Sequence, residues 1–209
     1  MKNFLKKYGY LIAVFILGIS IISTIYILQK VAPFGRNSLL TIDFFHQYGP
    51  MLAELYDRIK KGANIIYSFN TGLGLPYFRN FFNYLSSPLN IIIFLFKRRN
   101  IIMSYSIIIG LKSILSCITC SYYIHKKFNT NKLYMIGIAL LYGYSAYFTA
   151  YYWNIMWLDG MYILPLITLG IENIINKDNG VLYTLSLTLM LFTNYFIGYM
   201  TCIYSCIYF

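Results

Sequence analysis

The stretch YGYLIAVFILGISIISTIYIL, residues 8–28, carries no charged side chain and decides the class of fold. It is about 20 residues long, which is enough for an α-helix to cross the hydrocarbon core of a bilayer. Lys2, Lys6 and Lys7 precede it. A cleaved signal peptide has an apolar region of roughly 7–15 residues followed by small residues, whereas Gln29 follows here. We therefore predict an uncleaved membrane anchor.

The composition of the whole chain supports a membrane environment. Its 209 residues are 59% hydrophobic, 20% aromatic and 11% charged, with a mean hydropathy of +0.60. Soluble domains carry roughly 25% charged residues, and disordered chains combine low hydrophobicity with high charge. The net charge of +11 lies in short basic clusters between apolar runs, a pattern typical of membrane orientation rather than nucleic-acid binding. We expect membrane lipids as partners and no nucleic acid.

Further apolar runs predict an all-α polytopic membrane protein with about five transmembrane helices. The predicted spans are about 8–28, 101–124, 133–152, 161–175 and 181–209. Because the chain stops inside the last apolar run, we expect residues 1–209 to be the amino-terminal part of one membrane domain in a longer protein. The sequence therefore leaves open whether the fragment is active without segments beyond it.

Counting positive charges gives the topology. Residues 80–96 contain Ser86, Ser87 and Pro88 and only a short apolar part, so we expect a re-entrant or interfacial segment there rather than a span. With no crossing at this point, the lysines on the amino-terminal side are Lys2, Lys6, Lys7, Lys126, Lys127, Lys132 and Lys177. The short loop 151–160 on the other side has none. The positive-inside tendency then places the amino terminus in the cytoplasm and loop 30–100 outside.

The external loop contains a predicted amphipathic helix at about 44–61. Its large apolar residues recur every three or four positions, from Phe44 and Tyr48 to Leu52 and Leu55. Pro50 is expected to kink the helix. Such a helix would lie in the membrane interface with its apolar side in the headgroup region. The alternative is that this side packs against the spans.

Two other features of the loop suggest turns and ligand contacts. Gly72 and Gly74 lack the strand and helix that a phosphate-binding motif requires, so we interpret them as turn residues. Arg79 follows within a run of aromatic residues. This pattern is typical of an interfacial belt, and the same groups could hold a lipid phosphate or a sugar.

Only six residues of the chain are acidic, so each can be weighed separately. Asp43 directly precedes the predicted helix, where it would cap the helix or act as a general base for a hydroxyl acceptor at the membrane surface. His46 is close enough in sequence to join it as a metal ligand, but two ligands do not define a metal site. The predicted topology puts Asp43 and Asp159 on the same external face.

The spans contribute a second group of candidates. Trp157 and Asp159 lie at the expected outer mouth of two spans, where they would be solvated or would bind a sugar. Lys112 lies in mid-span, where a charge should face the bundle interior and pair with a carboxylate or a lipid phosphate. Asp159 and Glu172 are its candidate protein partners. The four cysteines lie in apolar spans and are interpreted as packing residues.

The order of these features along almost the whole chain resembles the bacterial YfhO family of multi-pass membrane proteins. The matching positions are Pro33-Phe34-Gly35, Asp43 with His46-Gln47-Tyr48, Gly72, Gly74, Ser87-Pro88-Leu89-Asn90, Lys112, Trp157, Asp159, Leu164-Pro165-Leu166, Gly170, Glu172, Asn194-Tyr195 and Gly198-Tyr199-Met200.

The resemblance implies a fold and function like those of GT-C membrane glycosyltransferases. Such an enzyme would be a hexosyltransferase in the bacterial plasma membrane, moving a sugar from a polyprenyl-phosphate carrier to a cell-wall polymer such as teichoic or lipoteichoic acid. In that class an Asp or Glu of the first external loop acts as the base, and the matching position here is Asp43. It is a single carboxylate rather than an acidic pair, which leaves a divalent cation open as a cofactor. Independently of the resemblance, the positive charges of Arg79 and Lys112 make them candidates for neutralising the leaving phosphate.

The predicted substrate-binding residues are Arg79, Lys112, Trp157, Asp159, His46 and Gln47.

Two other functions fit the same features. A transporter or flippase of lipid-linked sugars would also use an intramembrane lysine and an aromatic mouth, although no internal repeat is evident. A non-catalytic envelope-assembly protein would tolerate the loss of Asp43, Lys112 and Asp159 together.

Overall fold

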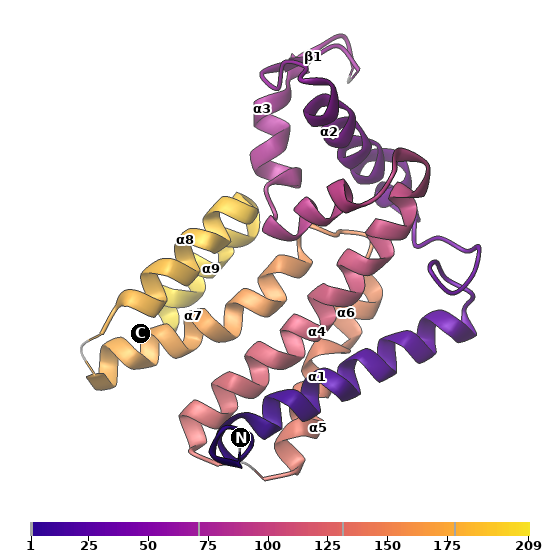
Figure 1. Cartoon of the computed structure of the whole chain (residues 1–209). Coiled ribbons are helices and arrows are strands. Elements are labelled where there is room, and N and C mark those ends of the chain that lie inside the picture. The colour runs from indigo at the N-terminus through magenta and orange to yellow at the C-terminus, as the bar shows by residue number, and fades with distance from the viewer. Residues whose placement is uncertain (1, 71, 131, 178) are drawn as a thin grey trace.

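A computed structural model describes residues 2–70, 72–130, 132–177 and 179–209, and it describes the side chains of these residues except 2–7 and 177. The chain is helical, with a bundle of long helices and a smaller cap at one end (Figure 1). Helix α1 (Lys2–Leu28) leads into the cap, which spans residues 30–100. Helix α4 (Ile101–Phe128) returns through the centre of the bundle.

Among the residues that the structure describes, three helices are long and apolar enough to cross a membrane. They cover Tyr8–Leu28, Arg98–Phe128 and Leu158–Asn176, with mean hydropathies of 2.7, 1.9 and 1.4. Each coincides with a span expected from the sequence. The third belongs to α7 (Leu158–Lys177), which begins three residues before the predicted start at Met161.

The other two predicted spans are interrupted. The first consists of α5 (Tyr134–Gly143) and α6 (Ala146–Tyr151), and Ser145 between them has an extended backbone. The second consists of α8 (Val181–Thr193) and α9 (Tyr195–Tyr208), which are separated at Asn194. Because α8 has 13 residues, it is only about 20 Å long at 1.5 Å per residue.

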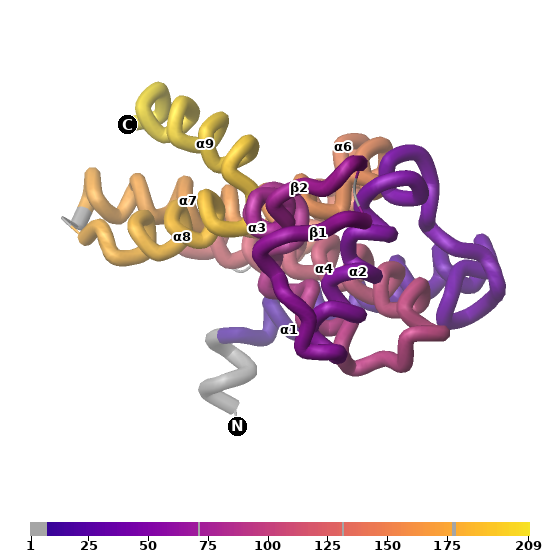
Figure 2. The backbone as a smooth tube through the Cα atoms, turned by 90° about the horizontal axis from the view of Figure 1, so that it is seen from above, coloured from indigo at the N-terminus to yellow at the C-terminus, as the bar shows by residue number. Residues whose placement is uncertain are grey.

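The break at Asn194 turns the chain back on itself. Asn194 has φ −160° and ψ 109°, and its side chain accepts a hydrogen bond from the amide of Ile197 at 2.9 Å, which caps α9. Tyr208, at the far end of α9, donates a hydrogen bond to Glu172 near the end of α7 at 2.7 Å. Helices α8 and α9 therefore form a hairpin beside α7 rather than one continuous span (Figure 2).

Helix α4 packs against α1, α5 and α7 through small side chains. Ser113, Ser116 and Cys117 are completely buried on it, and a Cβ on Gly143 of α5 would collide with the Cys117 sulfur. Small residues allow helix backbones to approach closely in a membrane protein. Cys117 and Cys120 are free thiols in this interface, consistent with the packing role predicted for them.

The cap contains several short elements. They are the π-helical turn η1 (Phe44–Tyr48), α2 (Gly49–Lys61), the hairpin strands β1 (Tyr67–Ser68) and β2 (Leu75–Pro76), α3 (Tyr77–Asn80), the π-helical turn η2 (Phe81–Leu85), and the 3₁₀ helices η3 (Pro88–Leu95) and η4 (Arg98–Asn100). Gly72 and Gly74 both have positive φ, at 57° and 112°, as their predicted turn role requires. Residues 80–96 form no membrane-spanning helix.

The apolar side of the predicted amphipathic helix is buried in protein. Phe44 and Leu52 are completely buried, and Leu55 is 5% exposed. They share one cluster with Tyr105 of α4 and Leu158 of α7. The expectation that this side lies in the headgroup region is therefore wrong for these residues, because the ends of the bundle helices cover it. Pro50 falls in the first turn of α2, where its missing N–H breaks no helical bond.

The two ends of the bundle differ in what they carry. The cap, the loop 152–157 and the α8–α9 break lie at one end (Figure 1). Lys126, Lys127 and Lys132 lie at the other end, around the α4–α5 connection. This arrangement puts Asp43 and Asp159 at the same end. Which side of the membrane this end faces stays a prediction from the lysine distribution.

Candidate functional site

Asp43 lies immediately before η1 and is half-buried. Its side chain makes no capping hydrogen bond to the helix that follows. Within the described residues it also forms no ion pair. Ile42 before it has φ +49°, a left-handed conformation that is an outlier for a β-branched residue. Such outliers concentrate at functional sites. Because Asp43 makes no capping bond, helix capping does not account for it.

The phenol of Tyr48 lies near Asp43. Burial raises the pKa of Tyr48 to about 12, and the nearby Asp43 carboxylate contributes to this rise. The phenol of Tyr48 therefore stays protonated at physiological pH and can donate a hydrogen bond. Its ring stacks on Tyr84 of η2 at a centroid distance of 5.4 Å. Thr41 hydrogen-bonds Tyr152 at 3.0 Å, which joins this segment to the loop before α7.

Lys112 and Asp159 form a completely buried ion pair, with 3.0 Å between Nζ and Oδ2. The Lys112 ammonium also donates to the carbonyl of Ile155 at 2.8 Å. The other carboxylate oxygen accepts hydrogen bonds from Ser87 at 2.9 Å and from Tyr162 at 2.8 Å. Both charges are thus paired and hydrogen-bonded, as burial requires.

This network corrects the expectation that Asp159 lies at an open mouth. Its side chain is 0% exposed, so a sugar could not reach it in this conformation. Of the two partners considered for Lys112, the structure selects Asp159. Glu172 pairs instead with Lys127 and accepts a hydrogen bond from Tyr123 at 3.1 Å, at the opposite end of the bundle.

Trp157 lies apart from the Asp159 carboxylate, in an apolar pocket of about 440 Å³. Its ring contacts Tyr151 and Phe196 at centroid distances of 5.8 and 6.3 Å. The pocket lies between the two interrupted helices, because Ser145 and Ile197 also line it. Trp157 can therefore contact an apolar or aromatic-stacking ligand there.

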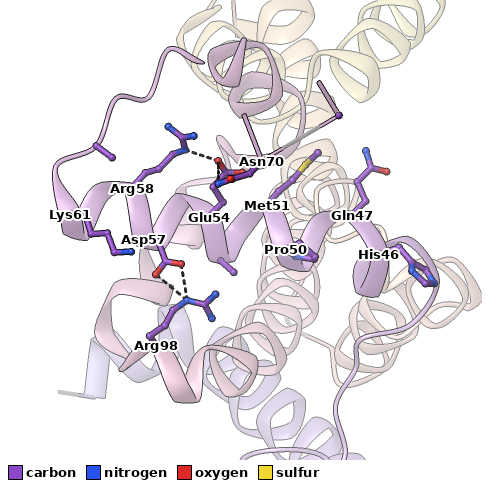
Figure 3. A pocket seen from close by; sticks show the side chains of 13 residues that line it. His46, Gln47, Pro50, Met51, Glu54, Asp57, Arg58, Lys61, Asn70 and Arg98 are labelled. Atoms are coloured by element: carbon purple, nitrogen blue, oxygen red, sulfur yellow. Dashed lines mark hydrogen bonds and ion pairs between the residues drawn. The ribbon is translucent and has the colours of Figure 1, made fainter. Parts of the chain in front are cut away.

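A larger pocket of about 790 Å³ opens in the cap along α2 (Figure 3). The polar residues lining it are His46, Gln47, Glu54, Asp57, Arg58, Lys61, Asn70 and Arg98. His46 and Gln47 were predicted from the sequence. The other polar lining residues were not predicted. Those on α2 could have been found, because they all lie on the polar face of the predicted amphipathic helix.

Glu54 organises one wall of this pocket. It accepts hydrogen bonds from Arg58 at 2.7 Å and from Ser68 at 2.5 Å. Asn70 donates a further one at 3.2 Å. Glu54 thereby ties the β1–β2 hairpin to α2, and this bond pattern holds the pocket open between them.

The structure does not bring Arg79 into either pocket. Its side chain is exposed and makes no hydrogen bond or ion pair with the described part of the chain. No group of three or more His, Cys, Asp or Glu side chains in that part could hold a metal ion. His46 contacts the ring of Phe45 instead, at a centroid distance of 5.0 Å.

The helical bundle, its long apolar helices and its buried Lys112–Asp159 ion pair are features of a multi-pass membrane protein. A family model for the bacterial membrane protein YfhO matches residues 13–209. The chain belongs to this family. No curated protein and no solved structure matches it.

Proposed function

We propose that this protein is a GT-C-like glycosyltransferase that moves a sugar from a polyprenyl-phosphate carrier to a hydroxyl group of a cell-envelope polymer such as teichoic or lipoteichoic acid. One observation supports it above others. Asp43 is a half-buried carboxylate with neither a cationic partner nor a capping bond in the described residues. It lies at the end of the bundle that carries a large polar pocket.

The proposed reaction gives Asp43 the role of general base. Its carboxylate accepts the proton of the acceptor hydroxyl while that oxygen attacks the anomeric carbon of the donor sugar. The bond between the anomeric carbon and the phosphate oxygen breaks, and polyprenyl phosphate leaves with the bonding electron pair. Tyr48, which stays protonated, orients the Asp43 carboxylate by its hydroxyl group.

The charge on the leaving phosphate needs a cation. Lys112 is buried and bound to Asp159, so we assign it to holding the loop before α7 in place. Arg79 is exposed in the cap and its guanidinium makes no contact with the described residues that would compete. It is the better candidate of the two for the phosphate.

The test is Asp43→Asn in the full-length protein produced in its host. The amide keeps the size of the side chain and removes the base, so we expect polymer glycosylation to fall by about 100-fold or more while the amount of protein in the membrane stays unchanged. Asp43→Glu, which restores a carboxylate, should recover part of the activity. Unreduced glycosylation by Asp43→Asn would refute the role of Asp43.

The interrupted helices favour a second candidate, a transporter or flippase of lipid-linked sugars. Helices broken within the bundle, as at Ser145 and Asn194, are characteristic of transporters. The two candidates separate in a vesicle assay. A flippase moves the lipid-linked sugar across the bilayer without an acceptor polymer, whereas a transferase needs the acceptor to consume the donor.

A further inference from the structure

The pocket along α2 holds cationic side chains with N–H donors that have no partner among the described residues. Arg98 uses its Nε to bind both oxygens of Asp57 at 3.1 Å, and its two terminal nitrogens have no partner among the described residues. Lys61 forms no hydrogen bond or ion pair in that part of the chain. Both side chains line the pocket, and Figure 3 shows them near one end of it.

The acidic groups of the pocket are already occupied. Glu54 is bound by Arg58, Ser68 and Asn70, and Asp57 is bound by Arg98. The lining therefore contains three cationic side chains, Arg58, Lys61 and Arg98, against two carboxylates that each already have an arginine partner. A ligand entering the pocket meets free donors and an excess of positive charge, which suits an anion.

The shape of the pocket indicates an elongated ligand. Its wall follows α2, whose 13 residues cover about 20 Å. His46 and Gln47 lie at one end and Lys61 at the other (Figure 3). His46 and Gln47 follow Asp43 by about one helical turn. One end of a bound chain would therefore approach the proposed base, while the other end meets the cationic side chains of Lys61 and Arg98.

We propose that this pocket binds a polyhydroxylated chain that carries phosphate, with a phosphate group at Lys61 and Arg98 and the chain running along α2 towards His46. Guanidinium and ammonium groups are well suited to phosphate oxygens. The polar wall formed by α2 and the β1–β2 hairpin favours a water-soluble chain over a lipid tail. This inference rests on the proposed function, in which the bound chain is the sugar acceptor.

The test measures binding of a short glycerol phosphate oligomer to the whole protein in detergent, by titration calorimetry. Lys61→Gln should weaken binding about fivefold, the scale of one lost ion pair, and binding should fall further at high salt. Lys60→Gln is the matched control. It removes the same charge one residue away, where the ammonium lies over the Tyr56 ring at 5.9 Å and outside the pocket.

The outcomes separate the two sources of phosphate. If the oligomer does not bind, or if Lys61→Gln and Lys60→Gln weaken it equally, the inference is wrong. It is also wrong if only vesicles containing phosphatidylglycerol bind in a Lys61-dependent manner, because the ligand is then a lipid headgroup.

The same experiment distinguishes this inference from the proposed function. If oligomer binding depends on Lys61 but sugar transfer survives Asp43→Asn, the ligand assigned to the pocket is supported and the role of Asp43 as the base is refuted. If sugar transfer needs Asp43 but the two lysine variants bind the oligomer equally well, the role of Asp43 is supported and the ligand assigned to the pocket is refuted.

Discussion

Asp43 and Asp159 lie at the same end of the bundle, yet their surroundings are opposite. Asp159 is completely buried, and its two oxygens are bound by Lys112, Ser87 and Tyr162. Asp43 is half-buried and has no cationic partner among the described residues. A carboxylate that is fully paired holds structure together, whereas one that is left unpaired near solvent is available to a ligand. This difference in burial and pairing indicates a structural role for Asp159 and a ligand-contacting role for Asp43.

The largest expected effect contrasts the two aspartates directly. Asp159→Asn leaves the Lys112 charge buried without a counter-charge, so we expect a loss of about 3–5 kcal/mol in unfolding free energy. Asp43→Asn removes no such partner and should change stability by no more than about 0.5 kcal/mol. Thermal unfolding of both variants in the same detergent measures this. Equal stabilities would abolish the distinction between the two sites.

A double substitution tests whether the loss comes from the pair itself. Lys112→Met alone leaves Asp159 buried and unpaired, whereas Lys112→Met combined with Asp159→Leu buries no charge. Apolar replacement of a buried pair is often neutral, so the double variant should be more stable than either single variant. A coupling energy near zero in the double-mutant cycle would show that the two side chains do not act as a pair.

Two adjacent serines of the cap provide a finer comparison. Ser87 donates to the Asp159 carboxylate at 2.9 Å, whereas Ser86 donates to the carbonyl of Phe192 at 2.6 Å. Hydrogen bonds to charged groups contribute about 1.5–3 kcal/mol and those to neutral groups about 0.5–1.5 kcal/mol. Ser87→Ala should therefore lower the unfolding free energy more than Ser86→Ala. The reverse order would argue against a charged Asp159.

The smallest expected effect concerns Tyr48 beside Asp43. Tyr48→Phe removes one hydroxyl group near the proposed base, and we expect transfer to fall about fivefold, the equivalent of one hydrogen bond. Because the pKa of Tyr48 is raised to about 12, the phenol is protonated throughout the assay range. The ratio of wild-type to variant rates should then be constant from about pH 6 to 9. A ratio that changes in this range would contradict the role given to Tyr48.

Much of the fold could be predicted because its signals are local. The apolar run 8–28 and the three-to-four spacing of residues 44–61 depend only on neighbouring positions, and the structure has helices in both places. The breaks at Ser145 and Asn194 were not predicted. Both lie in runs that contain no charged residue, and the break at Asn194 is held by contacts with η2, including a hydrogen bond from Asn194 to the carbonyl of Asn83 at 3.0 Å.

The candidate site was also predictable only in part, because its contacts join residues that are far apart in the sequence. Lys112 needed a partner, and the sequence supplied both Asp159 and Glu172. Which carboxylate is within reach depends on how α7 packs on α4, and residues 47 positions apart form the bond. Arg98 joins Asp57 in a comparable way, across 41 positions, which is why the pocket along α2 could not be predicted in full.

The sequence by itself determined the membrane environment, the long helices and the placement of Asp43 and Asp159 at one end, because hydropathy and charge act along the chain. The tertiary structure decided which of the two carboxylates is buried and which is left unpaired. Burial and partner choice arise when distant segments pack together. The packing of cap against bundle encloses Asp159 with Lys112 and Ser87, and leaves Asp43 half-buried beside Tyr48.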